Sequence, residues 1–366
     1  MVIGMVLQGF IRRLGHDSSA TNPPEALRVA AAPSVAANIA STNTDGIDGQ
    51  IADLSRRLDE ALEEIKSQRE ELARLTRAYA LDGEQLDRLR TLADVWNVPE
   101  IVAHVRERVA SAPVLTDPFP HMVIDQLLPA TAFQTLREAV PPEEFFAGAK
   151  PRTKDLRGID RAVIPTFSRA IWHSMGRDVV RMVLGPALAE RFRPHARDFL
   201  RMSVGDEFVD EALALPLKVH GLRIMLRRAG WKLPPHMDPK DQFVTTLLYL
   251  AGPGEPELYG TQLFRVEDNP NFVGRSANTY YPEDEGLRCD LVETMPYRGN
   301  LCLSFLNLGG GAHGAEVPAD AQPPDLERRV FQFYMGPDRP ALEALVDRLP
   351  ASLQAPWKTR VKNKDK

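Results

Sequence analysis

A chain of 366 residues that is 43% hydrophobic and 26% charged is long enough for one large domain or two ordinary ones, with a substantial core. Its net charge of −5 excludes a global basic field that would attract nucleic acid. Its two cysteines, Cys289 and Cys302, lack CxxC spacing and form no disulfide framework, so we expect reduced thiols in a cytoplasmic protein.

The first segment, residues 1–46, is predicted to be disordered. Its initial apolar stretch is shorter than the roughly 20 residues that a membrane span needs, and it lacks the pattern of a secretory signal. Residues 16–46 are rich in Ala, Ser, Asn, Thr and Pro. Such a segment buries too little apolar surface to offset its ordering entropy.

A heptad pattern characterises the next segment. One apolar series recurs every seven residues, at Ile51, Leu58, Ile65, Leu72 and Tyr79. A second series follows at Ile47, Leu54, Ala61, Gln68 and Leu75. This a/d seam favours a coiled coil over a single amphipathic helix packed on the neighbouring domain. We therefore predict a coiled-coil and helical oligomerisation region over residues 47–111, with a homo-oligomer formed through residues 47–80.

From residue 112 the sequence is typical of a globular α+β domain. The stretch "PFPHMVIDQLLPATAFQTLREAVP" predicts a strand, a turn at the proline and a helix from near Ala130. A second helix is predicted at "DVVRMVLGPALAERF". Five later segments are predicted to be strands: "GLRIMLRR", "FVTTLLYL", "TQLFRV", "NLCLSFLN" and "RRVFQFYM". Helices followed by short strands indicate a double-stranded β-helix, or jelly roll, with supporting helices over residues 112–337. A C-terminal helix and a basic tail, 338–366, complete the chain.

Three residues form a candidate metal site within these strands. His236 and Asp238 are two residues apart, a spacing that places both side chains on the same face of a strand. His313 follows a later predicted strand, between glycines that let the backbone turn. Two imidazoles and one carboxylate on one face of Fe(II) leave positions open for a 2-oxo acid and oxygen. Arg329, sixteen residues further on, has the planar group that binds a carboxylate with two hydrogen bonds.

The segment over roughly residues 112–337 resembles the 2-oxoglutarate/Fe(II)-dependent dioxygenase superfamily, and most closely the bacterial members related to the prolyl 4-hydroxylase catalytic domain. The stretches that carry the resemblance are "PFPHMVIDQLLP", "GWKLPPHMDPKDQFVTTLLYL", "YGTQLF", "YRGNLCLSFLN", "GAHGAEVP" and "RRVFQFYMGP". The resemblance implies Fe(II) as cofactor, 2-oxoglutarate as cosubstrate, and hydroxylation of an unactivated C–H bond with release of succinate and CO2. It does not cover the heptad segment, and nothing in the sequence identifies the substrate.

Carried over residue by residue, the resemblance implies that His236, Asp238 and His313 bind the iron. It also implies an arginine that binds 2-oxoglutarate, where collagen-type prolyl hydroxylases have a lysine. Arg328 and Arg329 are adjacent, and strand alternation lets only one of them face inward. The arginine-then-strand pattern of the family favours Arg329.

Neighbouring residues complete the expected site. Trp231 is a candidate wall of the pocket, and 2-oxoglutarate is expected to contact one or more of Thr245, Tyr249 and Thr261. The insertion "EDNPNFVGRSANTYYPEDEG" is predicted to form a loop over the site.

Two other functions fit parts of the sequence. Two histidines and a carboxylate also suit a zinc hydrolase, although the arginine favours iron. The chain could instead be an oligomeric coiled-coil scaffold that carries an inactive or ligand-binding oxygenase-like barrel.

Overall fold

The structure, a computed structural model, describes residues 44–148, 150–267, 278–307 and 312–358. The chain divides into two compact units, Met1–Ile65 and Lys66–Lys366. Most of the segment predicted to be disordered, and the basic tail, lie outside the described residues. None of the described helices combines the length and the apolar character that crossing a bilayer requires.

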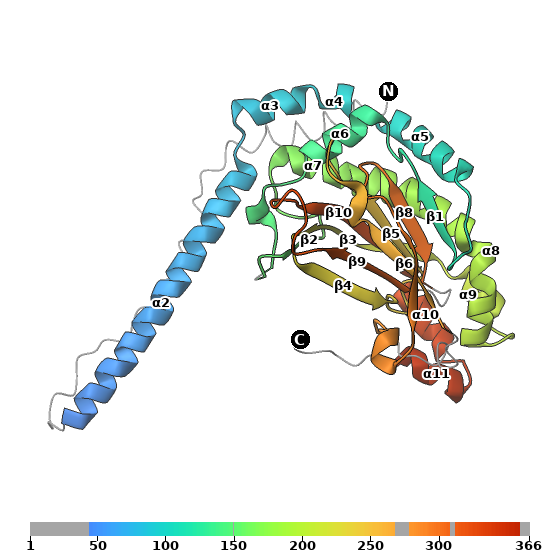
Figure 1. Ribbon diagram of the computed structural model, residues 1–366. Coiled ribbons are helices and arrows are strands. Elements are labelled where there is room, and N and C mark those ends of the chain that lie inside the picture. The colour runs from blue at the N-terminus through green and yellow to red at the C-terminus, as the bar shows by residue number, and fades with distance from the viewer. Residues whose placement is uncertain (1–43, 149, 268–277, 308–311, 359–366) are drawn as a thin grey trace. The chain divides into compact units, whose positions relative to one another are not determined.

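The heptad segment forms one continuous helix, α2 (Thr44–Tyr79), blue in Figure 1. Ion pairs three and four residues apart support it, such as those of Arg56 with Asp53 and Glu60. Several apolar side chains on this helix are 46–60% exposed: Ile51, Leu54, Leu58, Leu62 and Ile65. The predicted helix is confirmed, and the coiled coil and homo-oligomer stay predictions.

The helices that follow are part of the second unit. In chain order they are α3 (Gly83–Arg90), α4 (Leu92–Val95), α5 (Val98–Ser111), α6 (Ala130–Glu138), α7 (Thr166–Ser174), the π-helix η2 (Met175–Leu184), α8 (Gly185–Val204), α9 (Val209–Ala214), α10 (Arg339–Val346) and α11 (Ala351–Lys358). The helix predicted to begin near Ala130 is therefore confirmed.

Helix α5 shows how the segment before residue 112 joins the main core. It starts after Asn97, whose side chain accepts a hydrogen bond from the Glu100 amide. Its apolar residues recur every four positions, and Ile101, Val105 and Val109 are buried in the largest core cluster. The expected domain boundary between residues 111 and 112 thus falls inside one packed core.

Within the described residues, ten strands form two antiparallel sheets (Figure 1). The larger sheet has the order β1-β8-β5-β10-β3-β2 and the smaller one β4-β9-β6-β7. Their bounds are β1 (His121–Ile124), β2 (Thr153–Arg157), β3 (Leu217–Arg227), β4 (Trp231–His236), β5 (Val244–Tyr249), β6 (Thr261–Val266), β7 (Cys289–Thr294), β8 (Cys302–Leu306), β9 (Ala312–Val317) and β10 (Arg328–Pro337). Two antiparallel sheets with supporting helices agree with the expected jelly roll.

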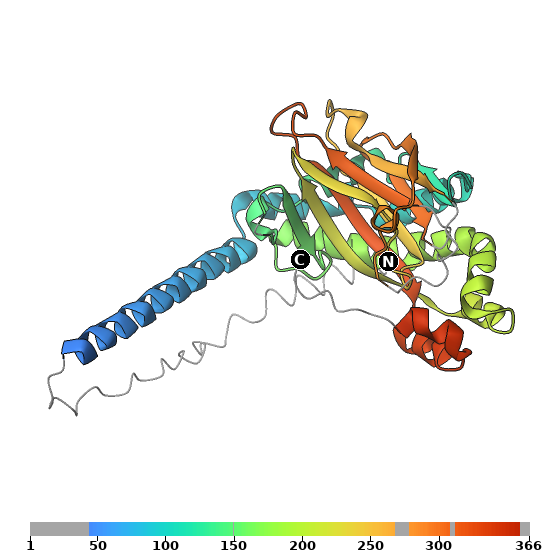
Figure 2. The ribbon, with the colours of Figure 1, turned by 60° about the horizontal axis from the view of Figure 1, so that its bottom comes forward.

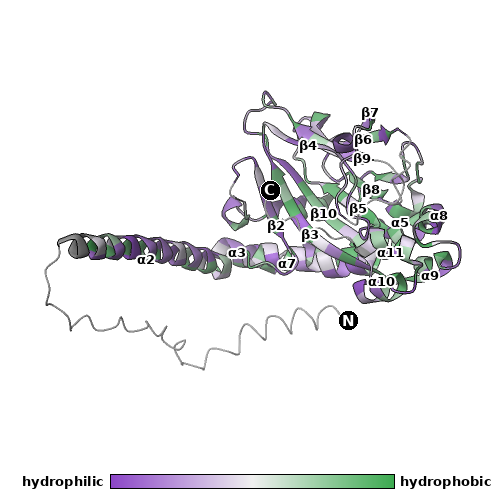
Figure 3. Ribbon diagram, turned by 90° about the horizontal axis from the view of Figure 1, so that it is seen from below, coloured by the Kyte–Doolittle hydropathy of each residue, from purple (hydrophilic) through white to green (hydrophobic). Residues whose placement is uncertain are grey.

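Alternation along the larger sheet separates two layers of core. On β3, Leu222, Ile224 and Leu226 point to the helices and join the largest core cluster. Residues on the opposite face, such as Leu303 on β8, pack instead with Leu263 of the smaller sheet. The helices therefore cover one face of the larger sheet and the smaller sheet covers the other, as Figures 1 and 2 show. Figure 3, a ribbon coloured by hydropathy, shows hydrophobic residues along strands of the larger sheet such as β5 and β10.

All five predicted strand segments are confirmed, as β3, β5, β6, β8 and β10. The sequence pattern does not predict three further strands, β2, β7 and β9. Strands β2 and β7 lie at sheet edges and are mostly exposed or half-buried, so they lack a hydrophobic pattern. Strand β9 has the sequence "AHGAEV", whose small residues and glycine are weak strand formers.

Candidate active site

The pairing of β4 with β9 brings the two histidines together. His236 ends β4, and His313 lies opposite it on β9, with ring centroids 4.2 Å apart. A Cβ on Gly314 would lie 2.8 Å from the carbonyl oxygen of Leu233, so glycine permits the close approach of the strands. The expectation that His313 lies in a glycine-rich turn is wrong, because its backbone is paired in a strand.

Asp238 lies two residues beyond the end of β4. An isolated bridge between Met237 and Tyr280 keeps the backbone extended there. The carboxylate contacts both rings: Oδ1 lies 3.7 Å from His236 Nε2, and Oδ2 lies 3.6 Å from His313 Nε2. The spacing of two residues thus acts as expected, although the strand itself stops at His236.

Hydrogen bonds orient this group of three. His236 Nδ1 donates to the Pro234 carbonyl at 3.0 Å, which leaves Nε2 as the nitrogen with a lone pair. Thr245 Oγ1 donates to Asp238 Oδ2 at 2.6 Å, and Asn307 Nδ2 donates to Thr245 Oγ1 at 2.7 Å. Thr245, itself held by Asn307, therefore fixes the orientation of the Asp238 carboxylate.

Burial sets the charge of His313, one member of this group. His236, Asp238 and His313 are each 5% exposed. Desolvation, together with the neighbouring His236, lowers the pKa of His313 to about 3, so its imidazole is neutral at physiological pH. One ligand atom from each of the three residues lies within 4.8 Å of the others. Two imidazoles and a carboxylate are a donor set that fits Fe(II).

A cavity of about 540 Å³ opens beside this group, a size typical of small-molecule sites. Both sheets line it. Besides the three candidate ligands, its walls include Trp231, Thr261, Tyr281, Arg328, Gln332 and Tyr334.

Arg328 is buried in the wall of this cavity, with 2% of its surface exposed. Its Nε donates to the carbonyl of Tyr259 at 2.5 Å, and Nη2 donates to Thr261 Oγ1 at 3.3 Å. Both acceptors are uncharged. Among the described residues, no carboxylate oxygen lies within 4.0 Å of its guanidinium.

Three aromatic rings surround the Arg328 guanidinium. Its carbon lies 5.9 Å from the ring centroid of Trp231, 5.6 Å from that of Tyr249 and 5.8 Å from that of Tyr297. These rings stabilise the cation only in part, and burial lowers the pKa of Arg328. A buried cation with uncharged partners fits an anionic ligand that completes the charge balance.

Arg329, the residue favoured by sequence, does not reach the cavity. Its side chain is 40% exposed and binds Glu327 through Nε at 3.2 Å and Nη2 at 2.6 Å. Alternation along β10 explains this: Phe331 and Phe333 share its face and pack with the helices. The inward position of the pair belongs to Arg328, so the choice of Arg329 needs correction.

Some of the other residues expected at the site line the cavity, and others do not. Trp231 and Thr261 line the cavity. Thr245 instead binds Asp238, and the Tyr249 hydroxyl accepts a hydrogen bond from the Thr261 amide behind Arg328. Of the insertion expected to cover the site, residues 268–277 lie outside the described residues. Its later part contributes Tyr281, whose ring centroid lies 5.7 Å from that of His236.

No family model matches the chain, and no curated protein matches it. Solved structures with a similar arrangement include HygX from Streptomyces hygroscopicus, solved with nickel and 2-oxoglutarate bound (15% identity, 71% of this chain and 89% of that chain, TM-score 0.34). A prolyl-4-hydroxylase from Pseudomonas putida is 13% identical over 65% of this chain and 99% of its own, with a TM-score of 0.35. A 2OG-Fe(II) oxygenase family oxidoreductase from Burkholderia pseudomallei is 12% identical, over 64% and 89%, with a TM-score of 0.31. Because these similarities are weak, the side chains of the site must carry the functional assignment.

Proposed function

We propose that this protein is an Fe(II)- and 2-oxoglutarate-dependent oxygenase that hydroxylates an unactivated C–H bond of its substrate. One observation carries the proposal. The buried group His236, Asp238 and His313 lines the same cavity as Arg328, a buried arginine with uncharged hydrogen-bond acceptors. A metal ligand set and a carboxylate-binding cation in one cavity are the two features that a 2-oxo dicarboxylic acid requires.

The roles follow from the geometry. His236 Nε2, His313 and the Asp238 carboxylate would hold the iron, with Thr245 fixing the carboxylate. When bound, iron and 2-oxoglutarate would supply the oxidation by O2: one oxygen atom would end in succinate as 2-oxoglutarate loses CO2, and the other would end in the hydroxylated substrate. Arg328 would bind the far carboxylate of 2-oxoglutarate, in place of Arg329.

The aromatic walls have a separate role. Trp231, Tyr249 and Tyr297 surround the Arg328 guanidinium and restrict water around it. An arginine–carboxylate hydrogen bond is strongest where water is excluded. The same walls therefore orient the cosubstrate and keep its binding tight.

Anaerobic titration of the full chain with Fe(II) and 2-oxoglutarate tests this proposal, with the visible absorption of the chelate as readout. We expect a band in the parent and none in His236→Ala. Arg328→Gln should require at least about tenfold more 2-oxoglutarate, since a charged hydrogen-bond pair contributes about 1.5–3 kcal/mol.

Arg329→Gln is the matched control, because it removes the same group one residue away. Its titration should follow that of the parent. If the parent gives no band, or if the protein binds zinc and is indifferent to 2-oxoglutarate, the proposal fails. Equal effects of the two arginine substitutions would exclude Arg328 as the specific anchor.

A further inference from the structure

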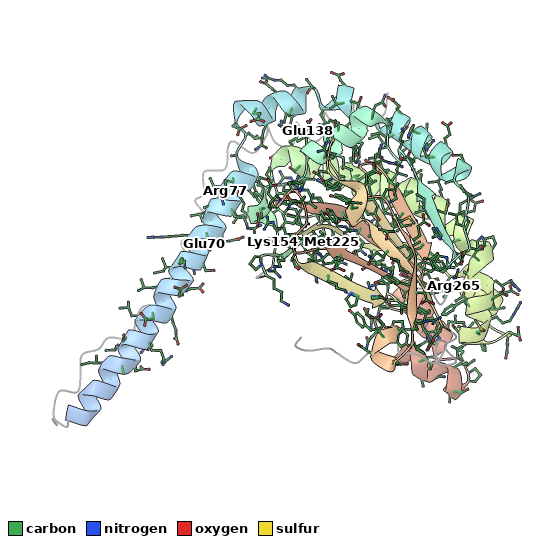
Figure 4. All side chains as sticks on the ribbon, viewed as in Figure 1. Glu70, Arg77, Glu138, Lys154, Met225 and Arg265 are labelled. Atoms are coloured by element: carbon green, nitrogen blue, oxygen red, sulfur yellow. The ribbon has the colours of Figure 1, made fainter. Side chains whose placement is uncertain are left out.

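A second group of arginines lines the cavity on the larger sheet. Arg157 on β2 lies directly opposite Arg223 on β3, and Gln332 on β10 lies opposite Arg223 on its other side. All three line the cavity. This row, Arg157–Arg223–Gln332, runs across three adjacent strands and places two guanidinium groups side by side. Figure 4 labels Lys154 and Met225, which lie on the same strands as Arg157 and Arg223, β2 and β3.

The row occupies a different part of the cavity from Arg328. Arg328 lies opposite Arg227, which is four residues from Arg223 along β3. At about 3.3 Å per residue, four residues of strand correspond to roughly 13 Å. The hydrogen bonds of the two side chains also differ: Arg328 binds Tyr259 and Thr261, whereas Arg223 binds Gln332 and Tyr334.

Tyr334 connects the row to the candidate metal ligands. Its hydroxyl accepts a hydrogen bond from Arg223 Nη2 at 3.1 Å. Burial and the charge of nearby Asp238 raise the pKa of Tyr334. Tyr334 and Asp238 also line the same cavity. The row consequently lies where a substrate next to the metal would be bound.

The backbone is shaped to hold Tyr334 in this place. The pairing of β10 with β3 shifts register between Gln332 and Tyr334. At the shift, Gly221 has a φ of +68°, and a Cβ there would lie 2.8 Å from Cδ2 of Tyr334. Only glycine fits this bulge, so the sheet is built to place the tyrosine ring beside Arg223.

The charges around the row are not balanced by the described residues. Asp155 is the one carboxylate shared by three arginines: its distance is 2.7 Å to Arg227, 3.8 Å to Arg223 and 3.9 Å to Arg157. The close hydrogen bond belongs to Arg227, and the short bonds of Arg223 go to the uncharged Gln332 and Tyr334. Like charges on directly opposite residues destabilise a sheet. An anion placed on Arg157 and Arg223 would remove that cost.

We propose that the substrate carries an anionic group, a phosphate monoester or a carboxylate, and that Arg157 and Arg223 bind this group while another part of the substrate faces the metal. The inference rests on the proposed oxygenase function for its second half, and the anion site is testable without it. Arg157 has 78% of its side chain exposed and Arg223 has 23%, so Arg157 lies nearer the solvent and Arg223 lies deeper in the cavity. An anionic group would thus be guided inward and then held.

Calorimetric titration of the full chain tests the site with three probes that share a phenyl ring and differ in charge: phenyl phosphate, benzoate and benzyl alcohol. The protein is loaded with Zn(II) and 2-oxoglutarate, and ionic strength is constant. We expect the parent to bind at least one anionic probe at least about tenfold more tightly than benzyl alcohol. Arg157→Gln and Arg223→Gln should each weaken that probe by roughly tenfold or more and leave benzyl alcohol unchanged. Preference for phenyl phosphate over benzoate, or the reverse, identifies the anionic group.

Arg288→Gln is the matched control. Arg288 is 73% exposed and pairs with Asp290 two residues away, much as Arg157 pairs with Asp155, but it does not line the cavity. Its binding should equal that of the parent. Arg223→Lys, which keeps the charge, should retain more affinity for phenyl phosphate than Arg223→Gln, and thermal melting checks that each variant is folded.

Two results would overturn the proposal. One is unchanged binding of both anionic probes in Arg157→Gln and Arg223→Gln. The other is loss of the 2-oxoglutarate chelate band in Arg223→Gln with Arg328→Gln unaffected, which would make the row the cosubstrate anchor. Two separate experiments distinguish the oxygenase function from the anion site: the Fe(II) titration tests the first, and calorimetric titration of metal-free protein tests the second. If the Fe(II) titration gives no chelate band but anion binding to the metal-free protein still depends on Arg157 and Arg223, the oxygenase function fails and the anion site stands.

Discussion

Arg328 and Arg329 are neighbours on β10, yet their guanidinium groups lie in opposite surroundings. Arg328 is 2% exposed and faces uncharged acceptors and aromatic rings inside the cavity. Arg329 is 40% exposed and binds Glu327 outside it. Of these two arginines, Arg328 alone therefore carries a charge that a ligand in the cavity can neutralise, and this difference has a consequence for stability as well as for binding.

Replacing Arg328 by methionine should stabilise the ligand-free protein. Exchange of a buried ion pair for apolar side chains of similar volume is often neutral or stabilising by about 1–4 kcal/mol, and we expect the same direction for a buried charge whose partners are uncharged. Arg329→Met removes only a partly exposed ion pair and should change stability by about 1 kcal/mol or less. Thermal melting with and without 2-oxoglutarate measures both effects. A strongly destabilised Arg328→Met would mean that the fold, and not a ligand, needs the charge.

The hydrogen bond from Thr245 to Asp238 should tune metal affinity. Loss of such an outer partner typically weakens metal binding about 10–100-fold, and we expect this range for Thr245→Val. Thr246→Val is the control, because Thr246 is equally buried but bonds to Ser304 and not to a candidate ligand. Competition with a chromogenic chelator measures the affinities. Similar losses in the two variants would point to a general effect on folding.

The buried His313 should make the metal-free protein sensitive to acid. Its folded pKa of about 3 lies below the usual histidine value of 6.5, so between these values the unfolded chain binds a proton that the folded chain does not. Stability contributed by the neutral ring is present above the upper value and is lost as the pH falls through this window, with a slope of at most about 1.4 kcal/mol per pH unit. Urea unfolding of the parent and of His313→Gln, followed as a function of pH, measures the slope. The variant should show a shallower dependence, and parallel curves would refute the assignment.

The sequence predicts the strands that have a continuous apolar pattern and misses those that lack one, for a physical reason. Strand β5, for example, is buried along its whole length, and its apolar and β-branched residues predict a strand from the sequence alone. Strand β9 is held by its neighbours β4 and β6, and its own residues carry little strand signal. The sequence therefore favours a turn at His313, although the chemistry of the ligand set predicts its pairing with His236.

The row Arg157–Arg223–Gln332 is assembled from distant parts of the sequence, so no local sequence pattern predicts it. Arg157 and Arg223 are 66 residues apart in sequence, and only the pairing of β2 with β3 brings them together. The alternation on β3 is a usable signal. Arg223 and Arg227 share one face, opposite Leu222, Ile224 and Leu226 in the core. Two arginines on the inner face of a barrel strand favour an anionic ligand, and this pattern is present in the amino-acid sequence itself.

The heptad seam of α2 supports a last prediction, that the protein self-associates through this helix. Its apolar side chains remain exposed in the single chain, and contiguous exposed apolar surface is typical of an interface. A double variant, Leu58→Lys with Ile65→Lys, places charges on two core positions of the seam and should convert the oligomer to a monomer in sedimentation analysis. Ser67→Lys, two residues from Ile65 and outside the seam, should leave the oligomer intact. Metal binding should be unchanged in all of them, since no candidate ligand belongs to this helix. A monomeric parent at micromolar concentration would refute the prediction.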